Sequence, residues 1–248
     1  MGNFRNSNGI ETMSESSRMN EWFVPKFGPI RFRAFVGILF LPYTGMCVSF
    51  AIIGSLLSHL IFWDRVAAIF IIYFLSVGVS AHAADNLGSR KTRPWGNYFT
   101  RSELIVMTIS GISIAYIIGI YYMIRSVPLL WPIAIAEGFF LVAYNFELFN
   151  GFFHNNKWFA ISWGSLPVLA GYSIQTNSIS ELSVIAASIA YVVAYLEIRI
   201  SRVYKELRRG GGENKHKSER LGYQLKVISL GTVISTLLFI CLKYFELF

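Results

Sequence analysis

Seven apolar stretches dominate this chain of 248 residues and restrict what it can fold into. They cover roughly residues 35–62, 66–84, 104–124, 129–149, 159–175, 182–200 and 223–245. Each is long enough to cross about 30 Å of hydrocarbon as a helix, and none has the alternating pattern of a barrel strand. With 54% hydrophobic and 15% charged residues, the composition excludes an ordinary soluble domain. The sequence therefore predicts an all-α, polytopic membrane bundle of about seven transmembrane helices.

Positive charges predict the orientation of this bundle, because Lys and Arg are retained on the cytoplasmic side of a membrane. The N-terminal tail, the loops after the second and fourth stretches, and residues 199–226 hold 19 of the 22 Lys and Arg residues. The opposite loops hold only Arg65, Arg125 and Lys243. The N-terminus is therefore expected in the cytoplasm and the C-terminus outside. The net charge of +8 then describes one membrane face, which favours anionic lipid headgroups or a phosphorylated substrate over nucleic acid.

The chain is expected to contain an N-terminal segment and one transmembrane domain. For residues 1–34 the sequence predicts a polar tail followed by an anchor at the membrane interface. In this anchor, aromatic residues are interleaved with Lys and Arg. For residues 35–248 the sequence predicts a single transmembrane helical domain without an internal repeat. Cys47 and Cys241 lie inside apolar stretches, so they indicate neither a disulfide framework nor a metal motif.

Polar residues at the ends of the even-numbered stretches are the candidates for a functional site, since ionisable groups are rarely placed in a membrane without a partner or a role. His82 and Asp85 are three residues apart at the end of the second stretch, and a continuing helix would place both on one face. Glu147 lies at the end of the fourth stretch. The other candidates in these regions are Arg90, Arg93, Asn145, Lys157, Arg199 and Arg202. The predicted topology opens all three helix ends on the cytoplasmic face.

A diphosphate suits this group of residues, because Arg side chains bind phosphate oxygens and acids hold a bridging divalent ion. An adjoining apolar and aromatic cavity would suit an isoprenoid tail. The same residues also have a purely structural explanation, since an acid and a cation at helix ends can pair and Arg is common beside membrane helices.

The region of Asp85 resembles the UbiA-type intramembrane prenyltransferases, which are all-helical and have an aspartate-rich motif, N-D-x-x-D-x-x-x-D, after the second span. Residues 81–89 here read Ala-His-Ala-Ala-Asp-Asn-Leu-Gly-Ser, and Arg93-Pro94 follows where the family has an Arg-Pro pair. Residues 163–176 are also similar to the family's fifth helix and its exit. The resemblance covers roughly residues 28–205.

The sequence departs from the family pattern at several positions. His82 and Ser89 stand where the first motif has aspartates, and Glu197 is the only acid where the second motif falls, after the sixth stretch. The family's Tyr-x-x-x-Lys is not reproduced, since Leu148 stands four residues after Tyr144. The family also commonly has nine spans, whereas this chain offers seven.

The resemblance implies a prenyltransferase in which acidic residues hold magnesium ions that neutralise a departing diphosphate, so that a prenyl group passes to a lipophilic acceptor. It implies His82, Asp85 and Glu147 as catalytic residues and as ligands of a divalent ion, Mg²⁺ first. Histidine is an unusual ligand for magnesium, which prefers oxygen. The residues implied for substrate binding are Arg90, Arg93, Asn145, Lys157, Arg199 and Arg202.

Three functions therefore remain open from the sequence. The first is the prenyltransferase. The second is a UbiA-fold protein that binds a lipid or quinone, or partners another membrane protein, without catalysis, and the depleted acidic motifs favour it. The third is a transporter or channel, for which Glu137 in the middle of the fourth stretch is the main argument. A Glu137 side chain paired with a hydroxyl of a neighbouring helix would remove that argument.

Overall fold

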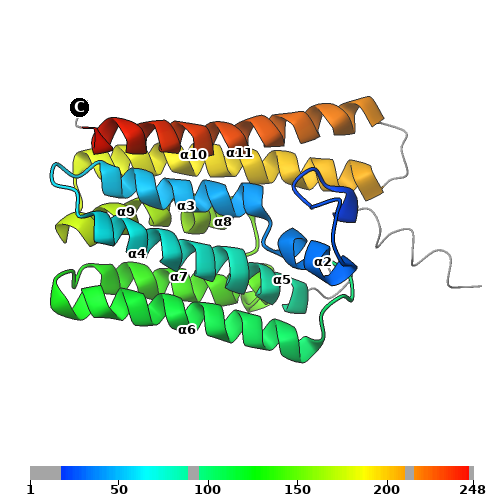
Figure 1. The fold of residues 1–248 in the computed structure, drawn as a ribbon, viewed down its shortest axis with the longest axis horizontal. Helices are drawn as coiled ribbons and strands as arrows, with labels where there is room; N and C mark the ends of the chain where they lie inside the picture. The colour runs from blue at the N-terminus through cyan, green and yellow to red at the C-terminus, as the bar shows by residue number, and fades with distance from the viewer. Residues whose placement is uncertain (1–17, 89–94, 210–214, 246–248) are drawn as a thin grey trace, which may run out of the picture.

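The computed structural model describes residues 18–88, 95–209 and 215–245, and within these ranges it is helical and contains no strand (Figure 1). The elements are η1 Arg18–Asn20, α2 Ile30–Ile38, α3 Leu41–Leu56, α4 Trp63–Tyr73, η2 Phe74–Ala81, α5 His82–Gly88, α6 Arg101–Arg125, α7 Leu130–Asn145, η3 Phe149–Gly151, α8 Asn156–Ala160, η4 Ile161–Ser165, α9 Leu166–Thr176, α10 Glu181–Arg209 and α11 Lys215–Tyr244. Most of these helices lie along the long axis of the molecule, which confirms the predicted all-helical bundle.

Five helical segments in the described ranges are long and apolar enough to cross a membrane. They are Ile30–Leu56, Trp63–Gly88, Arg101–Arg125, Glu181–Arg208 and Lys215–Tyr244. The helix Leu130–Asn145 is apolar but shorter, and the predicted stretch 159–175 lies in a helical run of three elements, α8, η4 and α9. The structure thus indicates a membrane protein, and the count of seven crossings stays a prediction.

The core of the bundle surrounds α3, in which twelve of sixteen residues are buried. This helix packs against α4, α9 and α11. Its contact with α9 is close because each helix presents a glycine to the backbone of the other. A Cβ atom on Gly54 would meet the carbonyl oxygen of Val168, and one on Gly171 would meet that of Ala51. Small residues of this kind allow helices to approach closely in a membrane.

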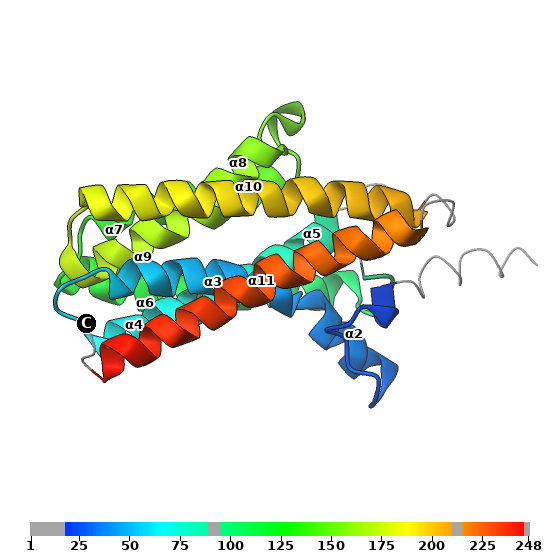
Figure 2. The ribbon, with the colours of Figure 1, turned by 90° about the horizontal axis from the view of Figure 1, so that it is seen from above.

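The first predicted stretch is broken into two helices at Phe40, which has a left-handed backbone with φ of 42°. Leu41 and Pro42 start α3 directly after it, and Pro42 fits the first turn of a helix. The hydroxyl of Thr44 donates to the carbonyl of Leu39 at 2.6 Å across the break. As a result α2 points away from the axis of α3 (Figure 2). The first predicted stretch is therefore bent at Phe40, and Ile30–Leu56 taken together is still long and apolar enough to cross a membrane.

The second predicted stretch is one continuous helical run from Trp63 to Gly88, which confirms that the helix continues through His82 and Asp85. Its middle part, η2, is π-helical, and so is η4 in the run before α9. Single π-helical turns often occur at functional sites, because the extra residue changes which side chains face a neighbour. Both π-helical segments pack against α3.

The segment between η1 and α2 folds onto the end of the bundle at which α5 and α10 end (Figure 1). Met19 and Val24 are buried in a cluster with Trp95 and Phe99. A salt bridge of 2.8 Å joins Glu21 to Arg208 of α10. The described part of the expected tail and anchor is therefore fixed to the helical bundle, and residues 1–17 lie outside the described residues.

Candidate functional site

A polar cluster lies where the ends of α5 and α10 meet the N-terminal segment. Its members are Arg18, Tyr43, His82, Asp85, Asn86, Tyr144, Glu197, Arg202 and Lys205. Tyr43 contacts the ring of His82, and Tyr144 interacts electrostatically with Asp85, Glu197 and Arg202. Residues that are up to 187 positions apart in the sequence therefore form one site, counted from Arg18 to Lys205.

The charged groups of the polar cluster interact electrostatically with one another. The ammonium group of Lys205 interacts electrostatically with the carboxylates of both Asp85 and Glu197. Two further cations, Arg18 and Arg202, lie within electrostatic reach of the same lysine. Three cations therefore interact with Asp85 and Glu197 at the end of a bundle of apolar helices, and Glu147 adds a third acid beside Asp85.

Several polar atoms of the cluster are buried without a hydrogen-bond partner. Among the described residues, such atoms are Tyr43 Oη, His82 Nδ1, Asn86 Nδ2, Glu197 Oε2 and Arg202 Nη2 in the cluster, and Ser80 Oγ and Asn156 Oδ1 elsewhere. Buried polar groups in proteins are nearly always hydrogen-bonded, because leaving one unpaired costs about 1–3 kcal/mol. Five of the seven exceptions belong to this one cluster, so its side chains are arranged to bind water or a polar ligand.

Local structure explains how α5 presents its part of the site. His82 and Asn86 are four residues apart on the helix and share a face. The rings of Phe40 and Tyr43 hold the imidazole, with centroid distances of 5.7 and 5.9 Å. Asn86 Oδ1 accepts a hydrogen bond of 3.1 Å from the backbone N–H of Trp95, so its Nδ2 is the free donor. The break at Phe40 therefore sets the position of two aromatic side chains around His82.

The predicted residues His82, Asp85 and Arg202 belong to the polar cluster. Glu147 follows α7 with a left-handed backbone, φ 49°, and lies within electrostatic reach of Asp85. Asn145 is buried beside them, but its Nδ2 already donates to the carbonyl of Leu141 at 2.8 Å. The prediction that three helix ends meet is therefore supported for α5, α7 and α10.

Other predicted residues do not join the cluster. Lys157 on α8 is exposed. Arg199 is exposed too, because it stands two residues after Glu197, about 200° around α10. Arg90 and Arg93 lie outside the described residues.

The divalent ion held by His82, Asp85 and Glu147 stays a prediction. Among the described residues, no group of three His, Cys, Asp or Glu side chains could hold a metal ion. His82 packs between aromatic rings, and Asp85 lies within reach of Lys205 and Arg18. These cations repel a second positive charge at the same place.

Sequence reasoning missed the central lysine of the site. Lys205 lies three residues after Arg202 on the same helix face, but the predicted sixth stretch ended at residue 200, whereas α10 continues to Arg209. Tyr43 and Asn86 could have been proposed from the sequence. Tyr43 is a tyrosine early in an apolar stretch, and Asn86 follows Asp85 directly. Arg18 had none, because only the folding of the N-terminal segment brings it to the cluster.

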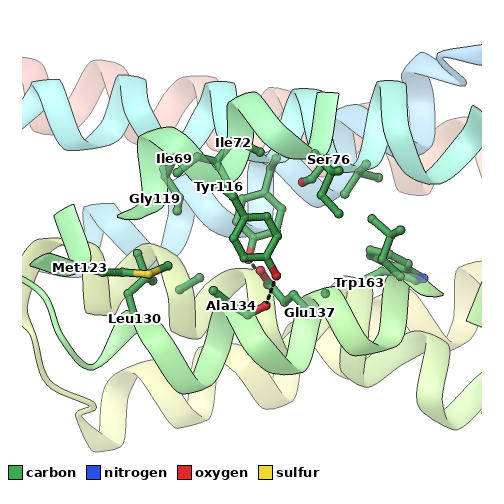
Figure 3. A pocket seen from close by; sticks show the side chains of 17 residues that line it. Ile69, Ile72, Ser76, Tyr116, Gly119, Met123, Leu130, Ala134, Glu137 and Trp163 are labelled. Atoms are coloured by element: carbon green, nitrogen blue, oxygen red, sulfur yellow. Dashed lines mark hydrogen bonds between the residues drawn. The ribbon is translucent and has the colours of Figure 1, made fainter. Parts of the chain in front are cut away.

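An apolar cavity of about 60 Å³ lies deeper in the bundle, between α4, η2, α6, α7, η4 and α9 (Figure 3). The described residues that line it are mainly aliphatic and aromatic, and Glu137 is the charged residue among them. The hydroxyl of Tyr73 donates to Glu137, and that of Tyr116 donates to the carbonyl of Ala134 at 2.7 Å. Glu137 is seven residues before Tyr144, so the cavity lies about 10 Å along α7 from the polar cluster.

The partner of Glu137 bears on the transporter hypothesis. Its carboxyl group is hydrogen-bonded to a hydroxyl of the neighbouring helix α4. This is the arrangement expected of an acid that joins two helices, and the main argument for a transport path is thereby lost.

Comparisons with protein-family models, curated proteins and solved structures found no match to this chain. The case for a function therefore depends on the sequence motif and on the geometry of the polar cluster and the cavity.

Proposed function

We propose that the protein is an integral membrane UbiA-like prenyltransferase, which transfers a prenyl group from an isoprenoid diphosphate to a lipophilic aromatic, quinone-type or lipid acceptor. The observation that carries this proposal is the concentration of unpartnered buried polar atoms beside three cations at the end of apolar helices. A ligand that matches both the cationic cluster and the apolar helices has a strongly anionic head and an apolar tail.

The diphosphate head would bind at the polar cluster. Arg202 supplies a guanidinium with a free Nη2 donor, and Lys205 and Arg18 supply further positive charge. Tyr43 and Asn86 supply neutral donors. The isoprenoid tail would lie along the apolar helices, because the cavity of about 60 Å³ is too small to hold it.

The reaction breaks the bond between the first prenyl carbon and the bridging diphosphate oxygen, and the electron pair leaves with the diphosphate. Lys205 and Arg202 stabilise the negative charge that develops on this leaving group. The acceptor forms the new bond to the prenyl carbon and loses a proton. Glu197 has a carboxylate oxygen without a partner and is our candidate for accepting that proton. The roles of His82, Asp85 and Glu147 as catalytic residues stay predictions.

The proposed enzyme is a multi-pass protein of the cell membrane with about seven crossings, a cytoplasmic N-terminus and an external C-terminus. The polar cluster and the cation-rich regions then share the cytoplasmic side. The positive charge of Lys205 near the cluster agrees with this orientation, because Lys and Arg are retained on the cytoplasmic side of a membrane.

A non-catalytic lipid-binding or membrane-partner protein is the second candidate. It is favoured by the loss of acids from the family motifs and by the pairing of the remaining acids with cations. Such a protein would bind the amphiphile at the same cluster without releasing diphosphate.

Binding of geranylgeranyl diphosphate to the purified full-length chain in lipid nanodiscs tests the proposal. We expect Arg202→Gln and Asp85→Ala to weaken binding, the former by about 10-fold or more because a charged hydrogen-bond donor is lost. Arg220→Gln, an exposed arginine on α11, is the matched control and should bind as the native chain does. Absence of binding by the native chain would overturn the proposal. Binding without diphosphate release, across a panel of phenol and quinol acceptors, would favour the non-catalytic candidate.

A further inference from the structure

Three polar atoms of the cluster, Tyr43 Oη, His82 Nδ1 and Asn86 Nδ2, are buried and have no hydrogen-bond partner. Because they are buried, a ligand can contact them only after one of the surrounding elements has moved. The element that moves should be one with little buried apolar surface, since such segments open at the lowest cost in free energy.

Residues 18–27, which we call the strap, lie over the end of α5 that carries part of the cluster (Figure 1). Ala83, the residue directly after His82, is buried in one hydrophobic cluster with residues of the strap. The ring centroid of Phe23 in the strap lies 5.2 Å from that of Phe40, which in turn lies 5.7 Å from that of His82. The strap therefore covers the side of the site that contains His82.

The strap also reaches the two long helices α10 and α11. Arg208 Nη1 of α10 donates hydrogen bonds to Glu21 Oε1 at 2.8 Å and to the hydroxyl of Tyr204 at 2.9 Å. The ammonium group of Lys226 on α11 lies 4.8 Å from the ring centroid of Trp22. Polar contacts near the surface thus join the strap to both helices, and Glu21 makes the ion pair among them.

The strap is held mainly by such contacts, because only Met19 and Val24 among its residues are buried. Arg33 of α2 donates to the carbonyls of Met19 and Pro25 at 3.1 and 2.7 Å, and water can replace these bonds when the strap lifts. Gly28 follows the strap with φ of 85°, a backbone conformation that glycine adopts without strain. Such a residue can absorb the change in backbone angles that a hinge requires.

We propose that the strap is a lid over the polar cluster. The ion pair between Glu21 and Arg208 keeps the lid closed, and rotation of the backbone at Gly28 opens it. This inference rests on the proposed function only in that the polar cluster binds a ligand. The lid then controls when the buried polar atoms of the cluster can be reached.

Labelling of a buried cysteine tests the lid. The reporter is Ala83→Cys in a full-length chain with Cys47→Ala and Cys241→Ser, in nanodiscs, because Ala83 is fully buried beside the strap. A maleimide can reach this thiol only while the strap is lifted. Glu21→Gln removes the charge that binds Arg208, and it should raise the labelling rate by about 5-fold or more. Glu206→Gln, an exposed acid on α10, is the matched control and should leave the rate unchanged.

Two further variants separate opening of the lid from a general loss of stability. Glu21→Arg combined with Arg208→Glu restores the ion pair with reversed charges, and it should return the labelling rate to within about 2-fold of the reporter chain. Tyr73→Phe destabilises the whole fold but leaves the strap intact, so it should not change the rate. If Tyr73→Phe and Glu21→Gln accelerate labelling equally, the thiol is reached by global unfolding and the inference is wrong.

Binding of geranylgeranyl diphosphate separates this inference from the proposed function. If both are right, Glu21→Gln binds the diphosphate with a higher association rate than the native chain. If labelling accelerates but the native chain binds no diphosphate, the proposed function is wrong and the lid covers a site for another ligand. If the native chain binds the diphosphate and labelling is unchanged in Glu21→Gln, the lid is wrong and the proposed function stands.

Discussion

Glu137 on α7 is held by the hydroxyl of Tyr73 on α4. In the sequence it is an ionisable residue in the middle of an apolar stretch, which is typical of transport proteins. In the structure its carboxyl group accepts a hydrogen bond from the hydroxyl of Tyr73, which lies on another helix. The sequence separation of 64 residues hides this partner. The role of an ionisable residue in a membrane is therefore decided by its nearest neighbours in space.

Removal of the Tyr73 hydroxyl should destabilise the fold. In Tyr73→Phe the carboxyl group of Glu137 loses its partner in an apolar cavity, and we expect the free energy of unfolding to fall by about 1–3 kcal/mol. A thermal unfolding scan in detergent would show this as a lower Tm. Tyr223→Phe removes the hydroxyl of a side chain that is 69% exposed, and its Tm should equal that of the native chain. Equal Tm values for both variants would show that the bond contributes nothing.

Some helices pack closely because glycine residues stand at their contact. The pair α3 and α9 approaches closely at Gly54 and Gly171, and this contact fixes the position of α3 in the core. At its start, α3 carries Tyr43 into the polar cluster, while the break at Phe40 turns α2 aside. The site is thus connected to the core through one helix.

A methyl group on Gly171 should separate α3 from α9. Its Cβ would overlap the carbonyl of Ala51, so Gly171→Ala is expected to lower the free energy of unfolding by about 1–3 kcal/mol. Gly231→Ala is the matched control, because a Cβ there meets nothing within 4 Å in the middle of α11. That substitution should raise stability by about 0.5–1 kcal/mol through the better helix propensity of alanine. The opposite order of the two Tm values would contradict the close contact.

At the scale of the whole molecule, the segment between η1 and α2, the end of α5, the C-terminal end of α10 and the start of α11 share one end of the bundle (Figure 1). The C-terminal end of α11 and the connection between α9 and α10 lie at the other end (Figure 2). The predicted topology places the first end in the cytoplasm.

Single cysteines in a chain with Cys47→Ala and Cys241→Ser test this orientation. A membrane-impermeant maleimide should label Ser178→Cys, between α9 and α10, from outside intact cells. It should label Glu219→Cys, near the start of α11, only after the cells are opened. The reverse pattern would mean that the bundle is inverted and that the polar cluster faces outward.

Much of the fold could be predicted from the sequence, because apolar runs long enough to cross a bilayer have to be helical to satisfy their backbone hydrogen bonds. The break at Phe40 was not predicted, since it depends on how Phe40 packs against His82 and Trp95. Of the site, His82, Asp85 and Arg202 were found from their positions at helix ends. Arg199 was predicted with them from its position at the same helix end, but it lies about 200° around α10 from Glu197 and is exposed.

The sequence by itself determined the class of structure and the helix ends at which polar residues gather, because hydropathy and charge are local properties of a chain. Only the tertiary structure decided which of these residues meet. It brought Arg18 and Lys205 to Asp85, turned Arg199 outward and paired Glu137 with Tyr73. These outcomes depend on close packing between helices that are distant in sequence, and this packing is not a local property.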